Sequence, residues 1–234
     1  VDEESTTQVT SKGMKITKSL SKELMVLRKI ADILLDSKST LEASQGNGVQ
    51  SELFNTLSSL LVQFLGHRRS YEQDHLNVLA ILKALLPNID SPTALSHFFR
   101  LSKLLSYENW SRLSGATRKE VTSTMRAISF CSGMEKSIDG ISKLLENMFA
   151  MHPKSVKEMD YDRVLPAISG LTNSDFVNSG SEPNFVTPLV YAFFALLQQD
   201  DPVASRSTFK ALRALVKAAA FEDQRQQSSS SSTV

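Results

Sequence analysis

Short amphipathic helical segments separated by turns run through nearly all of the 234 residues of the chain. In the first segment, Leu20, Leu24, Leu27 and Ile30 recur at steps of three and four, which places apolar side chains along one face of an α-helix. Nothing between the segments has the apolar–polar alternation that indicates a half-buried β-strand. The sequence therefore predicts helices and no sheet. The predicted helices cover residues 14–36, 49–65, 73–86, 93–104, 118–130, 138–149, 160–171, 185–197 and 203–221.

The helices are expected to pack as pairs. Pair starts fall near residues 14, 71, 115, 160 and 203. Most of these intervals are close to the period of about 40–47 residues that HEAT and armadillo repeats have, although no residue signature recurs in every pair. Helix pairs without a sheet are typical of stacked repeats that display binding surfaces. We therefore expect an all-α fold, a right-handed α-solenoid of about four to five irregular HEAT- or armadillo-like helix pairs.

Composition divides the chain into three parts. We expect residues 1–12 to form a flexible arm, residues 13–223 a helical-repeat domain, and the serine-rich residues 224–234 a disordered tail. Within the domain, the polar segments 37–48 and 173–184 are expected to be long flexible connections. Because the chain starts without methionine and consists of helix pairs, we interpret it as a fragment of a longer solenoid.

Bulk properties restrict the partners and the compartment. With 26 basic and 25 acidic side chains the formal charge is +1, so any affinity for RNA has to come from local patches. The single cysteine excludes an intramolecular disulfide and a zinc site of several thiolates, which suits a reducing intracellular compartment. No apolar run approaches the roughly 20 residues that span a bilayer, and no signal-peptide pattern is visible. We therefore expect no membrane partner.

No residue pattern of an enzyme or a metal site is visible. No two of the four histidines stand four residues apart, the spacing that lets one helix face hold a metal ion. The Gly-x-Ser-x-Gly elbow, the P-loop and the Gly-x-Gly-x-x-Gly fingerprint do not occur. Cys131, near a predicted helix end, is interpreted as a buried thiol. We expect a protein that is not an enzyme, with no catalytic, metal or cofactor site and no small-molecule substrate. The histidines are His67, His75, His97 and His152.

Acidic and small polar residues stand where predicted helices begin. Glu158, Asp160 and Asp162 are interpreted as capping and helix-dipole residues rather than as an acid–base pair. Ser91 is predicted to cap the helix that follows it, and Asp201 stands beside a proline at the start of the last helix.

The last predicted helix carries a one-sided group of basic residues. Their steps of 4, 3 and 4 align them along a single helix face, and no acidic residue interrupts them. The apolar residues Phe209, Leu212 and Val216 are expected along another face. The four basic residues, called the basic stripe below, are Arg206, Lys210, Arg213 and Lys217.

Two further basic groups are candidates for the same role. Either they are solvated surface, or they contact RNA phosphates or an acidic protein segment, and the sequence leaves both alternatives open. Stacking on unpaired bases would need exposed aromatic residues, for which Tyr107 and Trp110 are the candidates, since most phenylalanines are expected in the core. One group is His67, Arg68 and Arg69 at a helix corner, and the other is Arg112, Arg118, Lys119 and Arg126 around Trp110.

Two phrases resemble a known family. They are LSKLLSYENW at residues 101–110 and YDRVLPAISG at residues 161–170. Together with the helix pairs and the helix stops at Leu86-Pro87 and Leu165-Pro166, they look like part of the very large HEAT-repeat ribosome-assembly factors of the down-regulated-in-metastasis type, which belong to the nucleolar small-subunit processome. The resemblance implies a scaffold that contacts pre-ribosomal RNA and other assembly proteins. It carries over no individual site residue.

Two functions follow from these observations. The first is a non-catalytic helical-repeat scaffold that binds other protein subunits of a large assembly, and RNA through the basic groups, within a nucleolar complex for pre-ribosomal RNA processing. The alternative is a protein-only adaptor or transport-type solenoid that binds a peptide segment in an apolar groove.

Overall fold

Helices account for almost all of the chain that the structure describes. The computed structural model describes residues 22–41, 47–66, 72–106, 113–131, 136–152, 158–171, 183–198 and 201–230. This part contains nine α-helices, a single 3₁₀ turn and one isolated antiparallel bridge, and it has no strand beyond that bridge. The prediction of an all-α protein is therefore confirmed. The predicted arm 1–12 and the helix start near Met14 lie outside the described residues.

Two compact units make up the chain, where the sequence suggested one helical domain over residues 13–223. The units are Val1–Arg100 and Leu101–Val234, and their boundary falls inside α4. The helices that begin in the first unit are α1 (Lys22–Leu41), α2 (Asn47–Leu65), α3 (Glu72–Leu85) and α4 (Ser91–Leu104), with the 3₁₀ turn Leu86–Asn88 before α4. The second unit holds α6 (Gly115–Cys131), α7 (Lys136–Met148), α8 (Tyr161–Gly170), α10 (Pro183–Leu197) and α11 (Pro202–Ser230).

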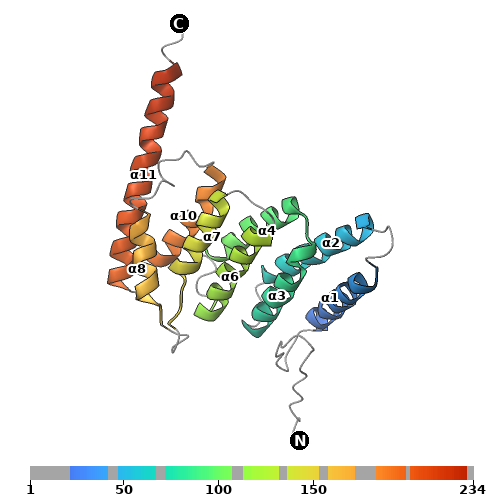
Figure 1. The fold of residues 1–234 in the computed structure, drawn as a ribbon. Helices are drawn as coiled ribbons and strands as arrows, with labels where there is room; N and C mark the ends of the chain where they lie inside the picture. Colours follow the sequence, from blue (N-terminus) through green and yellow to red (C-terminus); the bar gives the residue numbers. More distant parts are fainter. Residues whose placement is uncertain are drawn as a thin grey trace, which may run out of the picture. The chain divides into compact units, whose positions relative to one another are not determined.

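In the first unit the α1–α2 pair stacks on the helices that follow it. α1 lies against both α2 and α3, and α2 lies against α3 (Figure 1). The predicted stop at Leu86-Pro87 is confirmed, because α3 ends at Leu85 and a 3₁₀ turn follows. The helices bury apolar faces against their neighbours, as amphipathic helices in a layered fold must. The buried face of α3 is the broadest and includes the polar residues Asp74, His75 and Asn77. Fully buried members of this core are Leu24, Phe54, Leu61, Leu79 and Phe98.

The start of α4 is held against α2 by polar groups. Asp90 accepts a hydrogen bond from the backbone N–H of Thr93 at 2.8 Å, so Asp90 is the N-cap of α4. The side chain of Asn55 donates to the Asp90 carboxylate and accepts from its backbone N–H at 3.1 Å. The Thr93 N–H is the main cause that lowers the pKa of the Asp90 carboxyl. The prediction that Ser91 caps this helix is wrong, because Ser91 is its first helical residue.

His97 joins α4 to α2 inside the core. Its side chain is 1% exposed, and its Nε2 lies 2.8 Å from Ser58 Oγ. The Ser58 hydroxyl donates to the carbonyl of Asn55 at 2.9 Å, so it accepts from the Nε2–H of a neutral imidazole. Burial, with a smaller contribution from the charge of Arg100, lowers the pKa of His97 to about 4, although Asp90 opposes the shift.

We predict that acid destabilises the first unit through His97. The ordinary histidine pKa is 6.5 and the folded value is about 4, so between these values the unfolded chain binds more protons. Lowering the pH from about 7.5 to about 5 should therefore reduce the free energy of unfolding by about 1 to 2 kcal/mol at this residue. Urea unfolding at the two pH values measures the difference.

His97→Gln retains an amide donor for Ser58 and removes the titration, so its stability should depend less on pH over this range. The matched control for the change of residue type is His152→Gln, at an exposed position of the second unit. An H97Q variant whose stability has the wild-type dependence on pH would contradict the prediction that His97 causes the loss of stability in acid.

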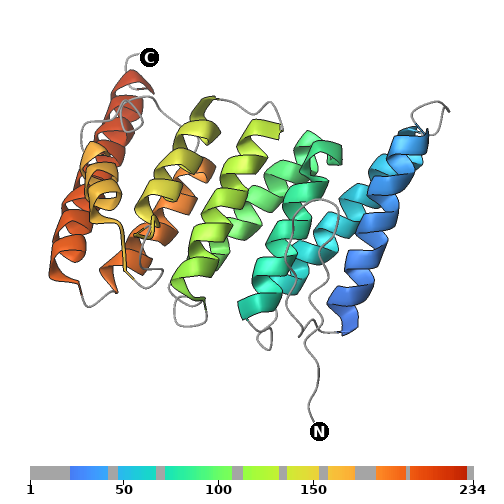
Figure 2. The same ribbon diagram turned by 60° about the horizontal axis from the view of Figure 1, so that its bottom comes forward.

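In the second unit two helix pairs stack on one another. α7 lies against α8 and α10, α11 lies against α8 and α10, and α6 packs along α7. Figure 2 shows α7 in front of α10 and α8 in front of α11, so each helix of one pair meets one helix of the other. Such stacking buries a continuous core between pairs. Buried members include Leu145, Met148, Ile168, Phe193 and Leu196.

Several helix ends differ from their predicted positions. α1 continues to Leu41 and α2 begins at Asn47, so much of the expected connection 37–48 is helical. α11 continues to Ser230, so residues 224–230 are helical where a disordered tail was expected. Alanine, glutamine and arginine, which dominate the stretch before the serines, favour helix without producing an apolar period.

Prolines lie inside two of the helices, and one of these helices is only partly covered. Pro166 lies inside α8, so the predicted helix stop at Leu165-Pro166 is wrong, and Pro188 lies inside α10. In α10, Phe193 is buried, while the next residue, Phe194, is half exposed. Neighbouring residues on a helix point about 100° apart, so one face of α10 remains in solvent.

Candidate nucleic-acid interface

The first turn of α11 is fixed by the residue that precedes it. Asp201 Oδ1 accepts hydrogen bonds from the backbone N–H groups of Val203 at 2.8 Å and Ala204 at 3.0 Å. The Tyr161 hydroxyl, at the start of α8, donates to the other Asp201 oxygen. The acidic start predicted for this helix is therefore a side-chain cap, and it joins α11 to α8. By contrast, Asp160 makes no side-chain capping bond to α8, which corrects its predicted role.

A line of small residues forms the packed face of α11. Ala204, Thr208 and Ala211 are almost fully buried, and their steps of four and three place them on one helix face. α11 packs against α8 and α10. Small side chains let helix backbones approach closely, so this line decides how α11 is rotated about its own axis.

The basic stripe lies on the opposite side of α11. All four side chains, Arg206, Lys210, Arg213 and Lys217, are exposed. At about 100° per residue they fall within about 60° of one another and roughly opposite the buried line. Their charges extend over about 16 Å of the helix. Residues 202–217 contain no carboxylate, so the stripe is a one-sign patch on this helix.

Two apolar side chains border the basic stripe. Phe209 and Val216 are each 60% exposed, although the sequence placed them on an apolar face together with Leu212. Most phenylalanines were expected in the core, and Phe209 is one that lies outside it. The sequence signal that would have predicted the exposure of Phe209 is the spacing of Ala204, Thr208 and Ala211. These small residues, rather than the large apolar ones, mark the buried face of the helix.

Arg118 and Lys119 are neighbours on α6 with different surroundings. The Arg118 guanidinium is partly buried and donates to the backbone carbonyl of Leu113, just before the helix. Burial lowers the pKa of Arg118. Lys119 is exposed. Arg118 thus stabilises the turn into α6, whereas Lys119 faces solvent.

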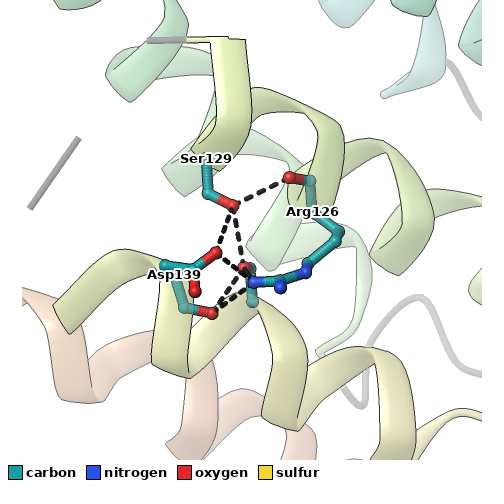
Figure 3. Close-up of polar contacts among 4 residues, drawn as sticks. Arg126, Ser129 and Asp139 are labelled. Atoms are coloured by element: carbon teal, nitrogen blue, oxygen red, sulfur yellow. Dashed lines mark hydrogen bonds and ion pairs between the residues drawn. The ribbon is translucent and has the colours of Figure 1, made fainter. Parts of the chain in front are cut away.

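Arg126 holds α6 to α7 instead of extending the basic surface. Its guanidinium forms an ion pair with the Asp139 carboxylate and donates to the Asp139 carbonyl at 2.8 Å and to Ser142 Oγ at 3.3 Å. The Ser129 and Ser142 hydroxyls are 3.0 Å apart, and Ser129 also bonds the carbonyl of Arg126 (Figure 3). The same guanidinium lies 4.2 Å from the ring centre of Phe130, a cation–π distance. The sequence did not predict this network.

The remaining candidates cannot be placed. Arg68, Arg69 and Arg112 lie outside the described residues, as do His67, Tyr107 and Trp110. Within the described ranges, no group of three histidine, cysteine, aspartate or glutamate side chains could hold a metal ion. No described helix is both long enough and apolar enough to cross a membrane. Of the candidate basic residues that the structure describes, the exposed ones are therefore the four of the stripe on α11 and Lys119.

The family of the chain follows from a sequence comparison. The family model described as U3 small nucleolar RNA-associated protein 20, N-terminal, matches residues 6–234. The chain belongs to this family. Among curated proteins and solved structures, none matched the chain.

Membership in the U3 small nucleolar RNA-associated protein 20 family confirms the resemblance drawn from residues 101–110 and 161–170. The family takes part in ribosome biogenesis in the nucleolus, as a component of the small-subunit processome. The processome is a large ribonucleoprotein, which is consistent with protein subunits as partners of this family.

The neighbours Arg118 and Lys119 allow a matched test, because one basic side chain is bonded within the fold and the other faces solvent. The test compares their contributions to the free energy of unfolding. Arg118→Ala should lower the free energy of unfolding by about 1 to 3 kcal/mol, because it removes the part-buried hydrogen bond to the Leu113 carbonyl and packed methylenes. Lys119→Ala should change it by less than about 0.5 kcal/mol. Urea unfolding of both variants measures the two values, and equal values would contradict the described roles.

Proposed function

We propose that this chain is a non-catalytic helical-repeat scaffold that binds RNA and other protein subunits during assembly of the small ribosomal subunit in the nucleolus. The observation that carries the RNA part is the basic stripe: four exposed cations, with no carboxylate among them, on the face of α11 opposite its packed face. The match to a family whose description names a small nucleolar RNA supports it.

The solenoid form of the scaffold is supported by the way helix pairs stack within each unit. α1 lies against α3 in the first unit, and α7 lies against α10 and α8 against α11 in the second. In HEAT- and armadillo-like solenoids, corresponding helices of successive pairs meet in the same way. We propose irregular pairs of this class, about four to five in number.

Electrostatics favour a phosphate backbone as the partner of the stripe. The formal charge of the chain is only +1, so its long-range field is weak and RNA has to be held by local contacts. Lysine and arginine that contact phosphates release counterions, which makes RNA binding depend on salt. Steps of about 6, 4.5 and 6 Å along α11 let neighbouring cations contact neighbouring phosphates of one strand.

We predict that replacing the stripe weakens RNA binding and its salt dependence together. Glutamine at Arg206, Lys210, Arg213 and Lys217 should lower affinity for a mixed-sequence single-stranded RNA about ten- to a hundredfold at moderate salt. The slope of log K against log salt should decrease in magnitude by up to about 3, at about 0.7 per lost phosphate contact. Fluorescence anisotropy over a salt series measures both.

The matched control removes four charges elsewhere. Lys22, Lys29, Lys103 and Lys143 are exposed on α1, α4 and α7, and glutamine at all four gives the same formal charge as the stripe variant. This control should retain most of the affinity and slope. Equal losses in both variants would mean that net charge alone acts, and no loss in the stripe variant would refute an RNA-binding stripe.

A second surface supports the binding of a protein subunit. Val26, Ile30 and Ile33 on α1 are exposed by between 42% and 66%, and their steps of four and three form a continuous apolar line. Leu24 and Ala31 are buried on the other side of the same helix, so Ile30 does not share the face of Leu24 as the sequence predicted. Contiguous apolar surface of this kind marks contact sites on soluble proteins, and the amphipathic helix of another subunit would cover it.

We predict that glutamine at Val26, Ile30 and Ile33 leaves the unit folded but releases the protein from its assembly. Exposed positions contribute little to stability, so Tm should change by only a few degrees. In gradient sedimentation, the full-length protein with these changes should move from pre-ribosomal to free fractions. Lys22→Gln with Lys29→Gln on the same helix is the control, and unchanged sedimentation of the triple variant would reject this surface.

A further inference from the structure

We infer that Phe209 is a stacking platform for an unpaired base, so that the basic stripe binds single-stranded RNA rather than a duplex. This inference rests on the proposed RNA-binding function and specifies the form of RNA that is bound. The observation behind the inference is that Phe209 does not pack in the core. Its side chain is 60% exposed on a helix whose other face is buried. Leaving most of a phenylalanine side chain in water forgoes the hydrophobic stabilisation that its burial would give.

The neighbours of Phe209 on α11 are suited to a base. Arg206 lies three residues before it and Arg213 four residues after it, and on a helix surface both spacings bring side chains side by side. Both residues are exposed. A guanidinium is planar and stacks on rings as well as binding phosphate in a fork, which an ammonium does not do. Phe209 therefore lies between two groups that can hold the phosphates on either side of a stacked base.

The arrangement excludes a duplex as the preferred ligand. In double-stranded RNA the bases are stacked on one another, and the major groove is too deep and narrow for side chains to reach them. A basic helix with no exposed ring would bind duplex and single strand through phosphates alike. A basic track next to an aromatic ring is the combination that single-strand binders use, and stacking contributes about 1 to 3 kcal/mol per base.

An acidic protein segment is the competing occupant. It would satisfy the four cations, and Phe209 and Val216 would then contact its apolar side chains. Phe209 is the only aromatic residue in residues 202–217, and this range contains no carboxylate. Because arginines flank Phe209 on both sides, the surface favours a ligand that offers phosphates and rings together.

The test uses the full chain and three RNA probes, each about twelve nucleotides long, within the range of single-strand site sizes. The probes are a single strand, the same strand with abasic positions, and a duplex. Phe209→Leu retains an apolar side chain without a ring, and it should weaken single-strand binding about five- to a hundredfold. It should leave the salt slope and binding of the abasic strand unchanged. Phe209→Trp should restore or exceed wild-type affinity.

A matched control and the stripe variant separate the possible results. Phe194→Leu removes a half-exposed phenylalanine from α10, a helix with no lysine or arginine, and should not affect RNA binding.

If the stripe variant weakens binding and Phe209→Leu does not, the stacking inference is overturned while the RNA-binding function stands. If the wild-type chain binds none of the probes, the proposed RNA-binding function itself fails. If Phe209→Leu weakens binding of a glutamate-rich peptide and not of RNA, the occupant is a protein and the inference is overturned.

Discussion

Burial of one line of side chains on each helix, between two neighbouring helices, is the constraint on which the rest of the structure depends. In the second unit this burial places α7 against α10 and α8 against α11. Once a helix has buried that line, its opposite line has to stay in solvent, because these pairs form only two layers. The buried line of α11 is Ala204, Thr208 and Ala211, and its burial is what turns the basic stripe outward. Surface chemistry in this fold is therefore set by packing.

Polar contacts fix details that apolar packing leaves free. An apolar line allows a helix to slide or rotate slightly, since dispersion and hydrophobic burial are not directional. The hydrogen bonds of His97 and Asp90 with α2, and the ion pair between Arg126 and Asp139, have narrow geometric requirements. Each joins two helices within one unit. Charged and titratable residues such as Arg126 and Asp139 therefore serve packing within a unit, although their residue types alone would suggest a binding surface.

Much of the helical organisation could be predicted from the sequence, but the environment of individual side chains could not. The 3.6-residue period locates all nine described helices, and Pro87 marks the end of α3. The period does not distinguish the large apolar residues that are buried from those that are exposed, and this is why it does not show that Phe209 is exposed. Arg118 and Lys119 are neighbouring basic residues in the sequence, but only Arg118 is partly buried and donates to the Leu113 carbonyl.

The sequence by itself determined the all-α class, the lack of a recognisable catalytic motif and the one-sided spacing of Arg206, Lys210, Arg213 and Lys217, since these follow from residue order and helix geometry alone. Only the tertiary structure decided that this stripe faces solvent beside an exposed phenylalanine, and that Arg126 is used inside the fold. The physical reason is that periodicity gives the relative angles of side chains about a helix axis, whereas the rotation of the helix is set by the neighbours against which it packs.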